Sequence, residues 1–96
     1  MSIVQFARFK SNNAEQVIKN ARVAKKIFEK HGAEFLRFSR FHTSAWAGEW
    51  LITTRYSNWE TYGKVQDAVA TDAELLLQQM EIAEMMGRNI AVGIDL

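Results

Sequence analysis

The 96-residue chain contains no cysteine and no proline. Without cysteine, disulfide bonds and thiolate chemistry are excluded, which fits a reducing compartment. The chain also lacks an excess of charge, because 12 basic and 11 acidic residues leave a net charge of +1. No apolar run approaches the roughly 20 residues that span a bilayer, and the first residues do not resemble a secretory signal. We therefore expect a cytoplasmic protein with no nucleic-acid partner and no membrane partner.

Sequence motifs that indicate a particular chemistry are also absent. There is no glycine-rich phosphate loop, no nucleophile elbow and no zinc-ligand spacing. The chain has two histidines, and neither has a carboxylate or thiol at a metal-binding spacing. We expect no metal and no cofactor. The length predicts one domain over residues 1–96, of a size that hides only about two-thirds of the surface of its unfolded chain.

The longest helical pattern follows the middle of the chain. Ser57 with Glu60 forms a capping box, and Thr71 with Glu74 repeats that signal. We therefore expect a helix over residues 58–87 that bends or restarts near the second signal. Its apolar residues recur with helical spacing and are expected to form a core face on a sheet. They are Trp59, Tyr62, Val65, Val69, Leu76, Met80 and Ala83.

A first helix is predicted nearer the N-terminus, from Ala14 to His31. It has an apolar stripe opposite a charged face. Asn12 with Glu15 resembles a capping box, and Gly32 can take the left-handed conformation that ends a helix. The element is therefore expected to pack on something flat.

Four segments alternate between two sets of side chains, as β-strands do: residues 2–10, 33–42, 49–56 and 89–96. The order strand, helix, strand, strand, helix, strand is that of a split βαβ unit. Right-handed crossovers place both helices on one face of the sheet. The predicted fold class is therefore α+β, a ferredoxin-like plait with a four-stranded antiparallel sheet.

The short connection between the second and third strands predicts a hairpin, whose register decides which side chains share a face. We favour a pairing of His42 with Glu49, because it opposes unlike charges and separates polar from apolar residues. One face then gathers Arg40, His42, Glu49, Thr53 and Arg55. The other face carries Phe35, Phe41, Trp50, Ile52 and Tyr56.

This register gives candidates for chemistry. His42 beside Glu49 could act as a general base, although a histidine at a strand end is more often a surface residue. Arg8, Arg40 and Arg55 could meet and bind a carboxylate or phenolate, for which a planar guanidinium is well shaped. The simpler alternative is that these arginines reach the rim of the sheet or pair across a dimer.

Aromatic side chains are candidates for a ligand pocket. Tyr62 could line it together with the three tryptophans, Trp46, Trp50 and Trp59. Aromatic residues at such spacing are more often core, and we expect this of Trp59. Trp46 lies in the hairpin loop, where a large apolar group needs a partner. Met80, Met85 and Met86 could supply an adaptable pocket wall, although core filling is the simpler interpretation.

The first strand carries apolar residues on both of its sides, and the chain has helices enough for one face of the sheet only. The other face would meet water unless something covers it. A second copy related by a two-fold axis is the simplest cover. We therefore expect a homodimer formed through the open face of the sheet.

Several segments resemble the dimeric α+β barrel superfamily, and within it the NIPSNAP-like and antibiotic-biosynthesis-monooxygenase-like groups. They are residues 6–9 (FARF), 30–33 (KHGA), 50–56 (WLITTRY) and 57–63 (SNWETYG), followed by a helical restart at 71–74 (TDAE). The resemblance covers nearly the whole chain and is one of layout. It implies a small pocket in each subunit between sheet and helices, used by members for cofactor-independent oxygenation, haem degradation, isomerisation or lactone chemistry. Haem-degrading members place a histidine on the second helix, and this chain has none there.

Three functions remain open. A cofactor-independent monooxygenase-like enzyme acting on a small aromatic or polyketide-like compound predicts an enclosed cavity reached by His42 or an arginine. A non-catalytic ligand-binding or stress-response module predicts a pocket without titratable groups. A structural homodimer predicts a solidly filled interior. The space between the second helix and the sheet distinguishes them.

Overall fold

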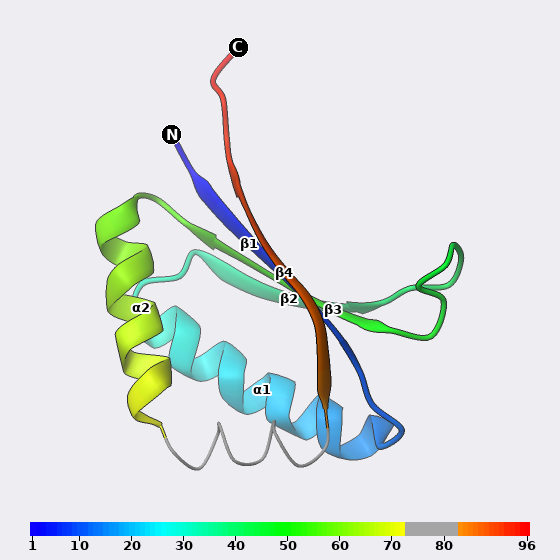
Figure 1. The fold of residues 1–96 in the computed structure, drawn as a ribbon. Coiled ribbons are helices and arrows are strands. Elements are labelled where there is room, and N and C mark those ends of the chain that lie inside the picture. The colour runs from blue at the N-terminus through cyan, green and yellow to red at the C-terminus, as the bar shows by residue number, and fades with distance from the viewer. Residues whose placement is uncertain (73–82) are drawn as a thin grey trace.

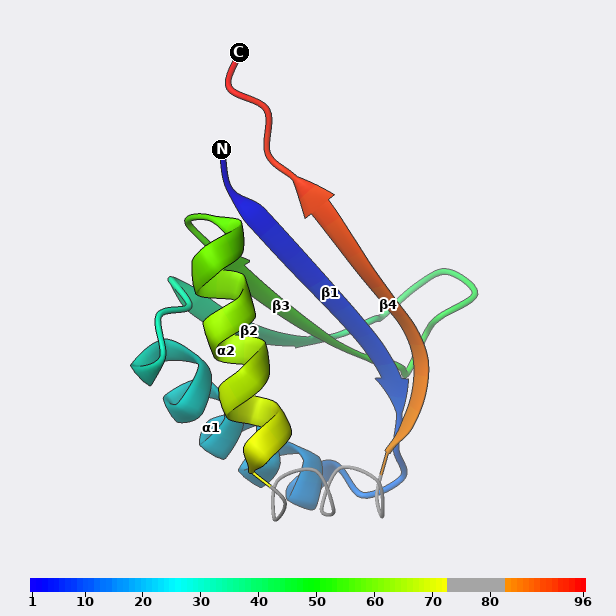
Figure 2. The same cartoon turned by 60° about the vertical axis from the view of Figure 1, so that its left-hand side comes forward.

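A computed structural model of the chain describes residues 1–72 and 83–96. The elements are β1 (Ile3–Lys10), α1 (Ala14–Lys30), β2 (Phe35–Arg40), β3 (Trp50–Tyr56), α2 (Trp59–Thr71) and β4 (Glu84–Val92). The strands form one antiparallel sheet in the order β2-β3-β1-β4, and both helices lie on one face of it (Figures 1 and 2). The predicted ferredoxin-like α+β fold is confirmed.

The core lies between the helices and one face of the sheet. Ile3, Tyr56 and Val65 are fully buried and join β1, β3 and α2. A second cluster, of Phe9, Val17 and Trp50, joins β1, α1 and β3. These residues alternate along the strands and recur with helical spacing along the helices, as the sequence pattern predicts.

The N-terminal cap of each described helix lies one residue later than predicted. Asn13 Oδ1 accepts from the Gln16 amide at 3.1 Å, and Asn58 Oδ1 accepts from the Thr61 amide at 2.8 Å. The caps predicted at Asn12 and Ser57 are therefore wrong, because in each pair the second residue is an asparagine, whose short amide side chain reaches the third amide beyond it.

Gly32, after α1, has a φ of +122°. This left-handed conformation favours glycine and confirms the predicted end of the first helix. Space gives a second reason for glycine, because a Cβ here would lie 2.7 Å from Thr61 Cγ2.

The C-terminal elements differ from their predicted bounds. α2 ends at Thr71, inside the stretch where a break was expected. Most of the predicted restart at residues 71–74, and also Leu76 and Met80, lie outside the described residues. A helix extending to Gly87 is wrong, since β4 already begins at Glu84 and pairs with β1. Predicting the last strand at residues 89–96 is wrong too: it stops at Val92, and Ile94 and Leu96 follow it as exposed residues.

The hairpin register differs by one residue from the favoured one. Arg40 pairs with Trp50, and the Phe41 amide donates to the Glu49 carbonyl at 2.9 Å. The predicted pairing of His42 with Glu49 is therefore wrong. A shift of one residue exchanges the faces of one strand relative to its neighbour. Arg40 thus shares the helix-covered face with Trp50, while Glu49 and Arg55 lie on the opposite face.

The opposite face of the sheet is covered by no element among the described residues (Figure 2). It carries half-buried apolar side chains from three strands: Val4, Phe6, Phe35 and Leu51. We call it the open face. Among residues 1–72 and 83–96, no helix has the length and hydropathy needed to cross a membrane.

Candidate functional site

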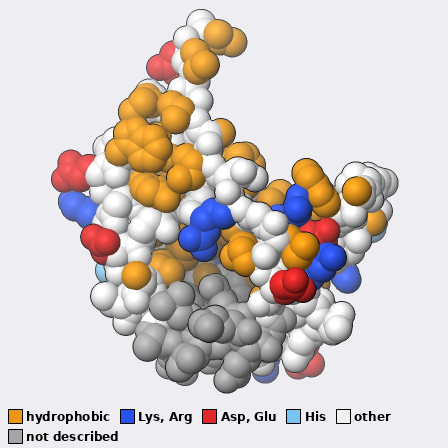
Figure 3. Space-filling model, viewed as in Figure 1, with side chains coloured by type: hydrophobic (Ala, Val, Ile, Leu, Met, Phe, Trp, Pro, Cys, Tyr) orange, Lys and Arg blue, Asp and Glu red, His pale blue; other side chains and the backbone are white. Residues whose placement is uncertain are grey.

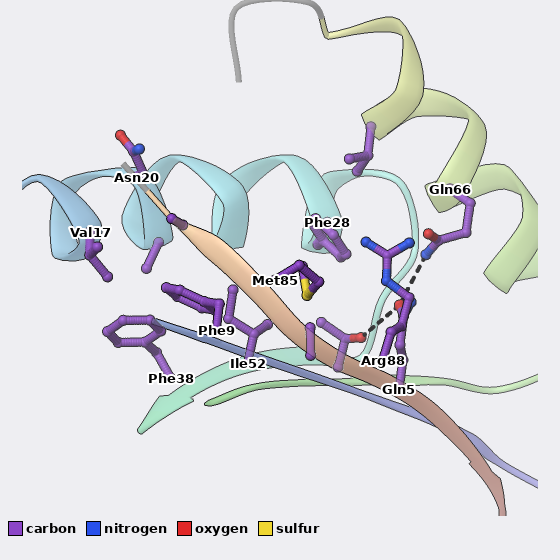
Figure 4. Close-up of a pocket in the computed structure, with 15 residues that line it drawn as sticks. Gln5, Phe9, Val17, Asn20, Phe28, Phe38, Ile52, Gln66, Met85 and Arg88 are labelled. Carbon is purple, nitrogen blue, oxygen red and sulfur yellow. Dashed lines mark hydrogen bonds between the residues drawn. The ribbon is translucent and has the colours of Figure 1, made fainter. Parts of the chain in front are cut away.

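A cavity of about 580 Å³ lies between the covered face of the sheet and the two helices (Figure 4). Most of the side chains around it are apolar, and they come from every described element. The lining residues are Gln5, Ala7, Phe9, Val17, Asn20, Ala21, Phe28, Phe38, Ile52, Thr54, Gln66, Val69, Ala83, Met85 and Arg88. A volume of this size suits a small organic molecule.

One end of the cavity is aromatic. The rings of Phe9 and Phe38 lie 6.2 Å apart between centroids, and Phe38 stacks on Trp50 at 5.0 Å. Val17 of α1 packs on the same cluster. This end offers flat apolar surfaces, the kind that a ring-bearing ligand can stack on.

The other end is built around the amide of Gln5, which is 6 % exposed. Its Oε1 is within hydrogen-bond distance of three donors from two elements: the Gln66 Nε2 of α2 at 3.2 Å, and from β3 the Tyr56 hydroxyl at 3.3 Å and the Thr54 hydroxyl at 3.5 Å. Figure 4 shows Gln66 reaching down from α2 toward Gln5. The network therefore fixes the position of the amide and ties α2 to the sheet.

The Tyr56 phenol belongs to this network and also lies near Thr54 Oγ1, at 3.0 Å. Burial raises the pKa of Tyr56 above 10.0, its ordinary value, because the ionised form would lose its hydration. The hydrogen bonds from its neighbours act in the opposite direction and are the smaller effect. At neutral pH the phenol is therefore protonated and can donate.

Two more polar side chains reach the cavity. Arg88 extends from the edge strand β4 toward the helices, on the same side of the sheet as Gln5 and Met85 (Figure 4). Asn20 of α1 is 5 % exposed, and its Oδ1 accepts from Gln16 Nε2 at 2.9 Å. Its Nδ2 is buried and has no hydrogen-bond partner within residues 1–72 and 83–96.

The residues predicted as a site lie outside the cavity, and they do not gather in one place, although Arg8 and Glu49 form a pair. Arg8 Nε is 3.0 Å from Glu49 Oε1 on the open face, an ion pair without the alignment of a hydrogen bond. Arg55 Nε pairs with Glu34 Oε2 at 3.2 Å. Arg40 Nε donates to the Gly48 carbonyl at 3.1 Å, and its guanidinium lies over the Trp50 ring. The predicted polar strip of Arg8, Arg40 and Arg55 is thus divided between the two faces.

The remaining candidates are also outside the cavity lining. His42 is exposed at the start of the hairpin loop. Tyr62 is half-buried and packs edge-on against Tyr56 and Trp59. Trp59, expected in the core, is 48 % exposed, so that expectation is wrong. A catalytic role for His42 stays a prediction. The same holds for the predicted ligand contacts of Arg8, Arg40, Glu49, Arg55 and Tyr62.

Trp46, the tryptophan of the hairpin loop, packs edge-on against Phe41 and lies under the Arg8 guanidinium at 4.0 Å. It is 44 % exposed. Met85 lines the cavity, Met86 is half-buried, and Met80 lies outside the described residues.

The sequence did hold a signal for the residues that were missed. Gln5 lies among Ile3, Ala7 and Phe9 on one side of β1, and Asn20 lies beside the buried Ala21 in the stripe of α1. A polar residue inside an apolar pattern is expected to be buried and hydrogen-bonded. Arg88 gave no such signal, because the boundary of its strand was misplaced.

In the described part of the chain, no three histidine, aspartate or glutamate side chains are grouped so as to hold a metal ion. The cavity wall there offers amides, one hydroxyl and a guanidinium. Such groups bind oxygen-bearing organic ligands rather than metal ions, whose usual ligands are carboxylate, imidazole or thiolate.

No protein-family model matches the chain, and no curated protein sequence matches it. Solved structures do. MupZ from Pseudomonas fluorescens superimposes with a TM-score of 0.76 at 14% identity, over 93% of this chain and 69% of MupZ. SnoaB, a cofactor-independent oxygenase from Streptomyces nogalater, gives 0.71 at 8% identity, over 99% and 95% of the two chains. A NIPSNAP family protein from Agrobacterium tumefaciens gives 0.72 at 10% identity, also over 99% and 95%.

At these identities the likeness concerns the fold. The chain shares the ferredoxin-like α+β fold of these proteins, so the resemblance predicted from its sequence is confirmed as a resemblance of fold. An oxygenase and a NIPSNAP protein share this fold, which therefore does not determine the reaction.

Proposed function

We propose that this protein binds a small, ring-bearing organic molecule in the cavity between its sheet and its helices. The observation that carries the proposal is the cavity of about 580 Å³ with an aromatic end and a polar end. Ligand sites in proteins typically combine a mainly apolar wall with a few fixed polar groups. A cavity of this volume argues against the alternative of a structural dimer with a filled interior.

The candidate reaction is cofactor-independent oxygenation of a small aromatic or polyketide-like compound. SnoaB, which has this fold, is a cofactor-independent oxygenase. The cavity meets one requirement set out for such an enzyme, because an arginine reaches it, although this is Arg88 and not one of the three arginines predicted. Without a cofactor, the substrate itself must supply the electrons that reduce O₂.

A homodimer through the open face is part of the proposal. That face bears apolar side chains from three strands, and no element in the described ranges covers it. Two of its arginines are already paired within the chain, Arg8 with Glu49 and Arg55 with Glu34, so these charges need no partner surface to neutralise them. The absence of cysteine fits a cytoplasmic location.

A thermal-shift screen of small aromatic and polyketide-like compounds tests the binding function. A ligand that binds only the folded chain raises its melting temperature, by an amount that grows with ligand concentration. Compounds that stabilise the protein are then tested in an oxygen electrode. Oxygen uptake that depends on both protein and compound supports the oxygenase. Stabilisation without uptake supports the non-catalytic binding module, and a screen without any stabilising compound contradicts the proposal.

A further inference from the structure

Besides the Asn20 amide, two hydrogen-bond donors of the cavity, in Gln5 and Arg88, have no acceptor within residues 1–72 and 83–96. With its Oε1 engaged by its neighbours, the Gln5 amide presents its Nε2 group, which donates to no residue in the ranges 1–72 and 83–96. The same is true of the Arg88 guanidinium, which forms no ion pair with an acidic side chain of those ranges. The Gln5 residue is 6 % exposed, whereas Arg88 is exposed.

The two donors lie close to one another on the same face of the sheet. Gln5 pairs with Ile90 and Ala7 pairs with Arg88, so Arg88 occupies the diagonal position next to Gln5 on the neighbouring strand. Side chains at diagonal positions of adjacent strands are near enough to contact one group together. Figure 4 shows both side chains on the cavity side of their strands.

The remaining groups near this pair do not compete for it. The Gln66 amide and the Tyr56 phenol are both directed at Gln5 Oε1. Apolar residues lie beyond them, with Met85 and Val69 on the wall and Phe28 opposite. The cavity therefore combines an apolar body with one donor-rich, positively charged corner at the sheet edge.

We propose that this corner binds the anionic group of the ligand, so that the natural ligand is an apolar ring compound bearing a carboxylate. A planar guanidinium holds a carboxylate with two parallel hydrogen bonds, and an amide N–H₂ beside it can complete the contact. Gln5 and Arg88 then determine specificity for the acid over its neutral analogues. This inference rests on the proposed binding function and names the substrate class for it.

The test compares two probes of the same size, 2-naphthoate and its neutral amide, 2-naphthamide, by isothermal titration calorimetry at neutral pH. We expect 2-naphthoate to bind the natural chain about tenfold more tightly or better, because hydrogen bonds to charged groups are the stronger kind. Arg88→Gln is expected to remove that preference without weakening 2-naphthamide. Arg22→Gln, which removes an equal charge from the exposed face of α1, is the matched control and leaves the preference intact.

Gln5→Glu isolates the second donor. The new carboxylate keeps an oxygen that accepts from Gln66, Tyr56 and Thr54, and it replaces the free N–H₂ by a second, negatively charged oxygen. We expect this variant to fold, as checked by urea unfolding, and to lose the preference for 2-naphthoate. If both probes bind equally to the natural chain and to Arg88→Gln, the carboxylate corner is wrong while the binding cavity stands. If neither probe binds, the proposed binding function itself fails, and the carboxylate corner with it.

Discussion

The two faces of the sheet differ in how their polar side chains are satisfied. On the open face, two arginines are paired inside the chain, Arg8 with Glu49 and Arg55 with Glu34. On the covered face, the amide of Gln5 accepts from its neighbours while its own donor and the Arg88 guanidinium face a cavity. The apolar side chains of the open face support the proposed dimer, and the unpaired donors of the covered face support the proposed ligand site.

Apolar residues on the surface follow a similar division. Figure 3 shows hydrophobic side chains gathered on one side of the molecule, over α2 and toward the chain ends. Trp59, Ile90 and Val92 are each close to half exposed. These three residues are not part of the cavity lining. On the open face, half-buried apolar residues such as Phe6 are covered by no element among the described residues.

Removing a large side chain from the covered face is expected to have the largest effect. Trp50 is 6 % exposed and stacks on Phe38, so Trp50→Ala should lower the free energy of unfolding by about 3–5 kcal/mol. Urea unfolding measures it. Trp46→Ala, in the exposed hairpin loop, is the matched control and should cost far less. A loss below about 1 kcal/mol for Trp50→Ala would contradict the burial of this strand.

A charge on the open face should disrupt assembly before it disrupts folding. Phe6→Glu would bury an unpaired carboxylate in the proposed dimer interface, weakening association by roughly a hundredfold or more. Light scattering at micromolar concentration should then change from the mass of two chains to that of one. Val23→Glu, on the exposed side of α1, should leave the mass at two chains. A single-chain mass for the natural protein would refute the dimer.

The ion pair of the open face can be weakened without changing its shape. Glu49 is 6 % exposed, and Glu49→Gln leaves Arg8 without its counter-charge, at a cost of about 1–3 kcal/mol in the free energy of unfolding. Glu60→Gln removes the carboxylate of the exposed pair with Lys64 and should have almost no effect. Equal losses in the two variants would show that burial of Glu49 does not strengthen its pair.

The smallest predicted effect is a pH dependence from the covered face. The folded chain raises the pKa of Tyr56 above 10.0, so above about pH 10 the unfolded chain loses this proton before the folded chain does. The contribution of Tyr56 is therefore complete below that pH and is lost as the pH rises through the folded pKa. The urea midpoint should fall more steeply there than for Tyr56→Phe. If the urea midpoint falls equally steeply with pH in the natural protein and in Tyr56→Phe, the raised pKa of Tyr56 is contradicted.

The sequence predicted the covered face better than it predicted the polar groups on it. Alternation in β1 correctly placed Ile3, Ala7 and Phe9 on one side, and periodicity identified Val65 as a core residue. The predicted polar strip of Arg8, Arg40 and Arg55 does not form, because the prediction depended on the hairpin register. Opposing unlike charges favoured His42 with Glu49, whereas the observed register buries Trp50 and Ile52 beside Phe38 under the helices. Burial of aromatic area outweighs one pair of partly solvated charges.

What the sequence determined by itself was the order of the elements and the apolar side of each, because periodicity of 2 or 3.6 residues is a local property of the chain. The tertiary structure alone decided which polar residues meet. Gln5, Gln66 and Arg88 come from β1, α2 and β4, and their proximity depends on strand register and on where a helix ends. A shift of one residue in the strand register reverses the face that a side chain occupies, and no local pattern in the sequence specifies the register to that accuracy.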